Sequence, residues 1–238
     1  MGLENNYKNH NIILSFNALA GEEVHIDSYV GSFENIYASL DNLYITNNQF
    51  NLNSGLIIDM EKDSLPLVIQ KNSFLTNVYR FEFDDDKLVY RYKTIIPGRI
   101  LNPFSMDEYN GYFRIVSTYA NIQTETLAYN FKLDNNQFTL ISQAGGMGID
   151  EQVYSVRFEK ELCYVVTFRQ IDPLYIVDYS DPNDIKIIGE LKTPGYSTYL
   201  HKYSDTLLIG IGMDTDENGR FIGGKISLYD VSDLDNIK

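Results

Sequence analysis

Two neighbouring carboxylates, Asp107 and Glu108, are the residues whose chemistry comes closest to that of an enzyme. Paired carboxylic acids can serve as acid and base in the hydrolysis of glycosidic bonds. Both residues lie in a segment with a strand-like pattern, and neighbours on a strand point to opposite faces of the sheet. One carboxylate should therefore face a neighbouring sheet, where we expect a buried ion pair with Arg157 rather than catalysis.

His201 is the histidine that could contribute to a site on the same inner strands. The other two histidines, His10 and His25, are distant in the sequence, which argues against a zinc site built from three histidines. We therefore expect His201 to be a hydrogen-bonded structural residue.

An acidic run at residues 214–219 (DTDENG) is the one stretch that resembles a metal loop. Its alternating oxygen donors and its glycine fit the first half of a calcium-binding loop, with Asp214, Asp216 and Asn218 as candidate ligands. Lys225 stands where such a loop needs a bidentate glutamate. The pattern therefore favours an ordinary hairpin loop, and calcium stays an alternative.

A short motif of turn residues occurs twice, with the two copies 52 residues apart. Its members are Asp178, Ser180 and Asp181 in the first copy and Asp230, Ser232 and Asp233 in the second. Aspartate and serine at the end of a strand can form hydrogen bonds with the backbone of the following turn. Because the motif recurs at equivalent places, we expect a structural role in a hairpin, and replacement should lower stability.

The same interval of 52 residues separates Ile185 from Ile237 and Lys186 from Lys238. Four strand-like segments, each bounded by Gly, Asn, Asp or Pro, fit within one interval. A period near 50 with four short strands is typical of the blades of a β-propeller. The sequence therefore predicts an all-β propeller with four-stranded antiparallel blades.

The strand pattern divides residues 12–238 into successive blades of a single domain, after a polar segment at residues 1–11. Partial blades are expected at both ends, and one blade should carry an inserted hairpin at 47–75. The predicted blades are 12–30 (partial), 35–95 (with the insertion), 103–143, 152–192 and 197–238 (partial). These blades do not complete a ring, so we expect a fragment of a longer protein.

Composition excludes several classes of function. Acidic residues outnumber basic ones by 33 to 19, so nucleic acid, whose phosphates attract cations, is not an expected partner. No apolar run approaches the ~18 residues of a membrane span, and the first residues are too polar for a signal peptide. The single cysteine, Cys163, lies in an apolar strand and should be buried and unreactive.

Ordered stretches over about 76–238 resemble a known family. They are 96–109 (IPGRILNPFSMDEY), 111–115 (GYFRI), 153–158 (VYSVRF), 166–174 (VTFRQIDPL), 189–196 (GELKTPGY), 199–201 (YLH) and 209–212 (IGIG). The family is that of secreted bacterial and archaeal proteins whose β-propeller domain is distantly related to WD repeats, and 174–190 resembles the LVIVD-type repeat of cell-surface propellers. Pro103, where the family pattern has glutamine, and the insertion at 47–75 depart from it. The resemblance implies an extracellular or cell-envelope location and supplies no catalytic residues.

These observations favour a non-catalytic binding or scaffolding module that presents loops, for example around 214–223, to a protein or a glycan. One alternative is an extracellular hydrolase of carbohydrate or lactone, with a central channel lined by Asp107, Glu108, Arg157 and His201. Another is a structural domain stabilised by calcium. No other cofactor is expected, and the ligand and the blade number of the whole protein stay open.

Overall fold

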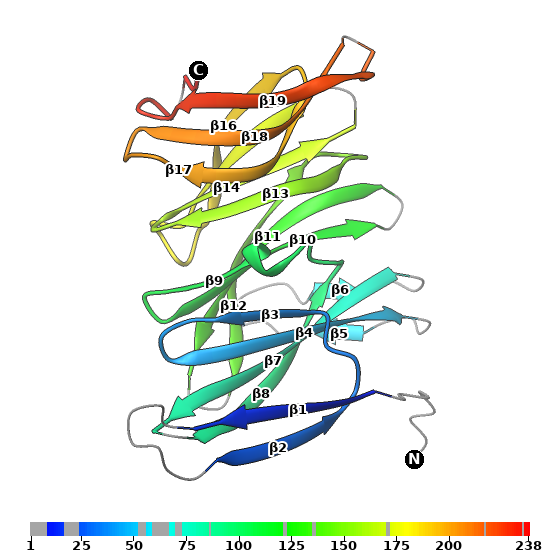
Figure 1. Cartoon of the computed structure of the whole chain (residues 1–238), viewed down its shortest axis with the longest axis vertical. Coiled ribbons are helices and arrows are strands. Elements are labelled where there is room, and N and C mark those ends of the chain that lie inside the picture. Colours follow the sequence, from blue (N-terminus) through cyan, green and yellow to red (C-terminus); the bar gives the residue numbers. More distant parts are fainter. Residues whose placement is uncertain are drawn as a thin grey trace.

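The structure is a computed structural model, and it describes residues 9–16, 24–51, 56–58, 67–69, 73–85, 87–120, 123–134, 137–169, 172–216, 218–234 and 236–238. These residues form antiparallel sheets that follow one another along the chain (Figure 1). The first sheet pairs β1 (His10–Ser15) with β2 (His25–Val30). It lies at one end of the molecule, and the C-terminal sheet lies at the other (Figure 1).

Three four-stranded sheets and one three-stranded sheet follow, each with its strands in chain order. The second sheet contains β3 (Asn35–Ala38), β4 (Asn42–Asn51), β7 (Ser73–Asp84) and β8 (Lys87–Pro97). The third contains β9 (Met106–Tyr109), β10 (Tyr112–Ala120), β11 (Thr124–Leu133) and β12 (Phe138–Met147), after the short 3-10 helix η1 (Pro103–Ser105). The fourth contains β13 (Gln152–Glu159), β14 (Leu162–Phe168), β15 (Asp172–Asp178) and β16 (Lys186–Thr193), and the fifth β17 (Tyr196–Lys202), β18 (Leu207–Thr215) and β19 (Phe221–Asp230).

The predicted all-β fold with four-stranded antiparallel sheets is confirmed. Between β4 and β7, the strands β5 (Leu56–Ile58) and β6 (Leu67–Ile69) pair as a separate hairpin. The insertion is shorter than the predicted 47–75, because β4 and β7 stay paired from Asn42 and Glu82 out to Asn51 and Ser73. The described sheets do not close into a ring, and no helix among the described residues could cross a membrane.

Tight turns close the hairpins between the first two strands of the third and fourth sheets. Asn110 and Gly111 both have positive φ, 51° and 79°, as a two-residue turn that matches the twist of the strands requires. Lys160 takes the same left-handed conformation, with a φ of 50°, in the equivalent turn of the fourth sheet. These turns set the register in which the first two strands of each sheet pair.

Neighbouring sheets pack face to face through separate clusters of buried side chains. Tyr44 of the second sheet stacks on Phe113 of the third, with ring centroids 4.4 Å apart. Cys163 is fully buried between the third and fourth sheets, as the sequence predicted, and burial raises the pKa of its thiol. Each sheet therefore has one face toward the preceding sheet and one toward the following sheet; we call these its backward and forward faces.

The linker into each of the last three sheets contains a glycine pressed against the sheet that follows. Gly98 has a φ of 89°, and a Cβ there would lie 2.4 Å from the backbone oxygen of Thr118 on β10. Any side chain at this position would therefore collide with backbone as well as strain the local conformation. Gly148 against Thr167, and Gly195 against Met213, repeat the arrangement in the next two linkers.

Candidate functional site

The two carboxylates Asp107 and Glu108 lie on opposite faces of β9 and belong to different interfaces. Asp107 pairs with Arg114, the residue directly opposite on β10, whose Nε donates to Asp107 Oδ2 at 3.0 Å. The prediction that Asp107 forms its ion pair with Arg157 is therefore wrong. The hairpin between β9 and β10 brings Arg114 within reach, so Asp107 has no need of a partner on the next sheet.

Arg114 occupies a closed environment between the third and fourth sheets. Its side chain is 3% exposed, and its guanidinium lies 4.9–5.1 Å from the ring centroids of Tyr109, Phe158 and Tyr179. Its Nη1 donates to the backbone oxygen of Lys160 in the turn of the fourth sheet. A cation enclosed by aromatic faces and paired with a carboxylate joins two sheets.

Glu108 accepts hydrogen bonds from three side chains of the second sheet. The donors are Tyr44 at 2.6 Å, Ser39 at 2.8 Å and Asn42 at 3.0–3.1 Å. The network continues, because Asn42 Oδ1 accepts from Arg80, which also donates to the backbone oxygen of Asp134 at 2.6 Å. Burial, and then the hydrogen bond to Glu108, raise the pKa of the Tyr44 phenol. Glu108 is thus held as an acceptor between the second and third sheets.

Arg157 and His201 do not join these carboxylates in one pocket. Arg157 lies opposite Tyr164 on β14, and its buried Nε has no hydrogen-bond partner within the described part of the chain. His201 is exposed, and its Nδ1 lies 3.4 Å from the hydroxyl of Tyr199 on the same strand. The four proposed channel residues therefore do not form the hydrolytic site that the alternative function requires.

The repeated turn motif forms local hydrogen bonds at the ends of β15 and β19. Asp178 Oδ1 accepts from the backbone N–H of Ser180 at 2.8 Å, and Asp230 Oδ1 accepts from that of Ser232 at 3.0 Å. Asp181 Oδ1 accepts from the backbone N–H of Asn183 at 3.0 Å. The backbone oxygen of Asp233 accepts from Asn236 at 3.1 Å, so each motif orders the turn that follows its strand.

The candidate calcium loop is also organised by its own backbone. Asp216 Oδ1 accepts from the backbone N–H groups of Asn218 and Arg220, both at 2.9 Å. Asp214 lies on β18 opposite Gly223. Within the described ranges, no group of three or more His, Cys, Asp or Glu side chains is arranged to hold a metal ion. The loop thus has the hydrogen bonds of a hairpin turn.

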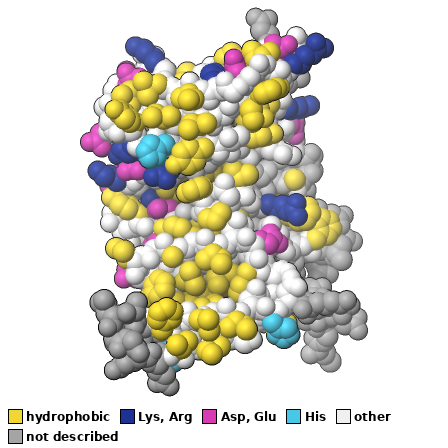
Figure 2. Space-filling model, in the orientation of Figure 1, with side chains coloured by type: hydrophobic (Ala, Val, Ile, Leu, Met, Phe, Trp, Pro, Cys, Tyr) yellow, Lys and Arg dark blue, Asp and Glu magenta, His cyan; other side chains and the backbone are white. Residues whose placement is uncertain are grey.

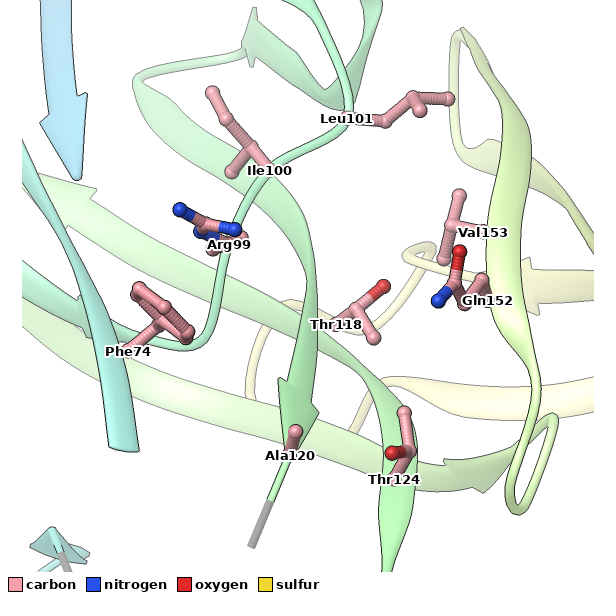
Figure 3. Close-up of a pocket in the computed structure, with 9 residues that line it drawn as sticks. All are labelled: Phe74, Arg99, Ile100, Leu101, Thr118, Ala120, Thr124, Gln152 and Val153. Atoms are coloured by element: carbon pink, nitrogen blue, oxygen red, sulfur yellow. The ribbon is translucent and has the colours of Figure 1, made fainter. Parts of the chain in front are cut away.

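A hollow of ≈ 360 Å³ opens where the linker after β8 crosses to the third sheet (Figure 3). It lies at the edge formed by the second, third and fourth sheets, and its size is within the range of small ligand sites. Its lining consists of Phe74, Arg99, Ile100, Leu101, Thr118, Ala120, Thr124, Gln152 and Val153.

Backbone hydrogen bonds fix the linker that builds this hollow. Arg99 and Thr118 exchange both of their backbone hydrogen bonds, at 2.8 and 2.9 Å. Gly98 donates to the backbone oxygen of Phe74 at 2.7 Å, and its own oxygen accepts from the Thr76 hydroxyl at 2.8 Å. The linker is therefore tied to both the second and the third sheets, so it forms a preorganised wall.

Arg99 is the charged side chain of the hollow. Its guanidinium carbon lies 3.7 Å from the centroid of the Phe74 ring, and within the described ranges no carboxylate forms an ion pair with it. Stacking restricts the guanidinium plane while leaving its N–H groups at the edge free to donate. Thr118, Thr124 and Gln152 add neutral polar groups on the other side (Figure 3). The chemistry of these groups suits an anionic or polar ligand, and the described lining residues include no nucleophile with an adjacent base.

This hollow was not among the sites predicted from the sequence. The signal that could have indicated it is Pro97-Gly98-Arg99, which lies near the start of the first long stretch of the family resemblance and at the end of a strand. A proline and a glycine at a strand end indicate a sharp change of direction. The contact with Phe74, 25 residues earlier in the chain, depends on how two sheets pack.

Comparisons with known proteins agree with this architecture. A family model described as a beta propeller domain matches residues 3–238. An uncharacterised protein of Archaeoglobus fulgidus is 41% identical over 143 residues, which cover 60% of this chain and 21% of the relative. An uncharacterised protein of Methanocaldococcus jannaschii is 40% identical over 144 residues, which cover 60% of this chain and 22% of the relative. The matched segment thus spans about a fifth of each relative.

Proposed function

Because this chain belongs to the beta propeller domain family, we propose that it is a non-catalytic binding module that presents the hollow beside Arg99 to a protein or glycan partner. The observation that carries the proposal is the guanidinium of Arg99, stacked on Phe74 in a wall fixed by backbone hydrogen bonds. Propellers hold variable connections on a rigid frame, and such connections are where binding residues gather.

The positions of the Asp107 and Glu108 carboxylates support a binding role rather than hydrolysis. Asp107 and Glu108 serve two different interfaces, and their oxygens are held by side chains of the frame. A hydrolase needs an acid and a base on either side of one bond. The described residues offer no such pair in the hollow beside Arg99.

Arg99 favours a partner that brings an acidic group. Arginine recognises carboxylates through two parallel N–H donors, and stacking on an aromatic ring keeps that edge available. The chain has a net charge of −14, so a basic side chain that forms no ion pair with the described carboxylates stands out against its surroundings. An acidic sugar, or an acidic side chain on a partner protein, fits this chemistry. The family resemblance supports an extracellular or cell-envelope setting.

Calorimetric titration tests the proposal, with a trimer of galacturonic acid and a glutamate-rich peptide as probes and their uncharged counterparts as references. We expect one acidic probe to bind at least about tenfold more tightly than its neutral counterpart, since a charge-assisted hydrogen bond contributes about 1.5–3 kcal/mol. Arg99→Gln should abolish the difference, and Phe74→Ala should reduce it. Arg169→Gln, at an exposed arginine outside the hollow, serves as the matched control. Equal binding by wild type and Arg99→Gln would exclude this site.

A further inference from the structure

The hollow beside Arg99 contains three neutral side chains that are available for hydrogen bonds. Thr118, Thr124 and Gln152 line it, and within the described part of the chain none of these side chains has a hydrogen-bond partner. Water satisfies such groups while the hollow is empty, and a ligand that enters must replace those hydrogen bonds. The hollow therefore suits a ligand with several hydrogen-bonding groups of its own.

These neutral groups and the cation lie in different parts of the hollow. Figure 3 shows Arg99 beside Phe74 on one side, Gln152 on the opposite side, and Thr118 and Thr124 between them. A ligand that spans the ≈ 360 Å³ of the hollow thus meets one positive charge and then neutral donors and acceptors. A carboxylate by itself would fill only the part beside Arg99.

A carboxylate at the end away from Arg99 would meet negative charge. Asp150 Oδ1 accepts from the backbone N–H of Thr124 at 3.4 Å, and Glu125 and Glu151 are the sequence neighbours of Thr124 and Gln152. A hydroxyl group can donate a hydrogen bond to such a carboxylate, whereas a second anion is repelled by it. The charges around the hollow therefore favour a ligand with a single carboxylate.

The wider surface gives the same indication. Figure 2 shows Lys and Arg side chains at separate places on the visible face, with acidic side chains among them. A polyanion binds most strongly to a continuous basic surface. The cation of the hollow is thus suited to one acidic group rather than to a row of them.

The backbone of the walls is already paired, which disfavours an extended peptide. Arg99 and Thr118 bond to each other through both backbone groups, and both backbone groups of Thr124 bond to Asp150. A peptide that binds as an added strand needs a row of free backbone donors and acceptors. These wall residues offer none, so recognition depends on their side chains, and hydroxyl groups of a sugar match them.

We propose that the ligand of this hollow is an acidic sugar with one carboxylate. The carboxylate binds Arg99, and neighbouring hydroxyl groups of the sugar bind the three neutral side chains. The aliphatic side chains of Leu101 and Val153, which also line the hollow, provide apolar surface for the C–H groups of a sugar ring. This inference rests on the proposed binding function and identifies the class of ligand for the same site.

Calorimetric titration of the whole chain with four related probes tests this class of ligand. The first is cellobiouronic acid, in which one glucuronic acid is linked to glucose, and the second is cellobiose, which has no carboxylate. The third is a disaccharide of two glucuronic acid units, and the fourth is a capped tripeptide with one glutamate between two glycines. We expect cellobiouronic acid to bind at least about tenfold more tightly than each of the others.

Substitutions in the hollow test the two kinds of contact separately. Thr124→Val and Gln152→Leu each remove neutral hydrogen-bonding groups at similar size and should weaken the binding of cellobiouronic acid by about three- to tenfold. Arg99→Gln should reduce its affinity to that of cellobiose. Thr206→Val, at an exposed threonine outside the hollow, is the matched control and should bind like wild type. Melting temperatures check that the variants are folded.

The outcomes distinguish this inference from the proposed function on which it rests. Binding of the tripeptide that requires Arg99 but is unchanged in Thr124→Val and Gln152→Leu would overturn the acidic sugar and leave the binding module in place. Equal affinity for the disaccharides with one and two carboxylates would overturn the single carboxylate. Absence of binding by every probe would overturn both proposals.

Discussion

The interface between the third and fourth sheets and the interface between the fourth and fifth sheets solve the same packing problem with different chemistry. The first places Arg114 and Asp107 at its forward-facing positions and surrounds the cation with three aromatic rings. The second places Tyr164 at the position equivalent to Arg114, in an apolar cluster that includes Ile176, Leu200 and Leu208. Arg114 and Tyr164 are buried to a similar degree, at 2% and 4% exposed.

The difference teaches that position, rather than residue type, determines burial in these sheets. A buried ion pair loses about as much free energy in desolvation as it gains by attraction, so it adds little net stability. It does require one particular partner, because an unpaired buried charge is costly. The third sheet is therefore specific for its neighbour, whereas the apolar faces depend on area and shape.

Breaking the ion pair should have the largest effect. Arg114→Met leaves Asp107 beside an apolar surface without its cation, and we expect a loss of about 3–5 kcal/mol in the free energy of unfolding. The double variant Asp107→Leu with Arg114→Met should recover most of this loss, because both charges are then absent. Urea denaturation measures both variants. A double variant no more stable than the single one would show that the pair itself provides the stability.

In the apolar interface between the fourth and fifth sheets, the loss in the free energy of unfolding should increase with the side-chain volume that is removed. Ile176→Ala creates a cavity beneath the fifth sheet, with an expected loss of about 2–4 kcal/mol, and Ile176→Val should lose about 1 kcal/mol. Leu40→Ala, at an exposed turn, should stay within about 0.5 kcal/mol of wild type. The same denaturation experiment ranks the three variants. An equal loss for Val and Ala would contradict packing as the cause.

Replacing Gly98, the linker glycine before the third sheet, should lower the stability of the fold because a Cβ at this position would collide with the backbone of β10. Gly98→Ala combines a positive φ with a Cβ 2.4 Å from the Thr118 oxygen, and we expect a loss of about 2 kcal/mol or more. Gly111→Ala has a similar φ but open space around its Cβ, and it should lose about 1 kcal/mol. Comparing the melting temperatures of the two variants separates the effect of the Cβ contact at Gly98 from the effect of positive φ alone. Equal decreases in melting temperature would mean that the structure relieves the contact with the Thr118 oxygen.

The turn motif should give the smallest effect, visible in the pH dependence of stability. Hydrogen bonds from the hydroxyl and the backbone N–H of Ser232 hold the pKa of Asp230 below its usual value. The carboxylate therefore stabilises the fold above the unfolded pKa of about 3.9, and this contribution is lost as pH falls through the lower folded pKa. Melting temperatures of wild type and Asp230→Asn between neutral and acidic pH should converge at the acidic end. Parallel curves would rule out this role.

Much of the fold could be predicted from the sequence because the strands, their turns and the interval of 52 residues are local signals. The separation of Asp107 from Glu108 followed from strand alternation alone. The partner of Asp107 could also have been found, because a two-residue turn at Asn110 and Gly111 places Arg114 opposite it. The hollow beside Arg99 could not be predicted in this way, since Phe74 reaches it only through the packing of two sheets.

The linker glycines have a consequence for how such a chain evolves. Gly98, Gly148 and Gly195 lie against residues toward the end of the second strand of the sheet that follows, so close contacts of the linker help to set the step between repeats. Side chains at equivalent positions of successive sheets can then differ while the sheets keep the same order. Asp107, Arg157 and His201, three unlike residues, accordingly occupy one equivalent position on the first strands of successive sheets. Equivalent strands can therefore carry different side chains while the sheets keep their arrangement. A binding surface can be built from such side chains on a sheet whose position the linker already fixes.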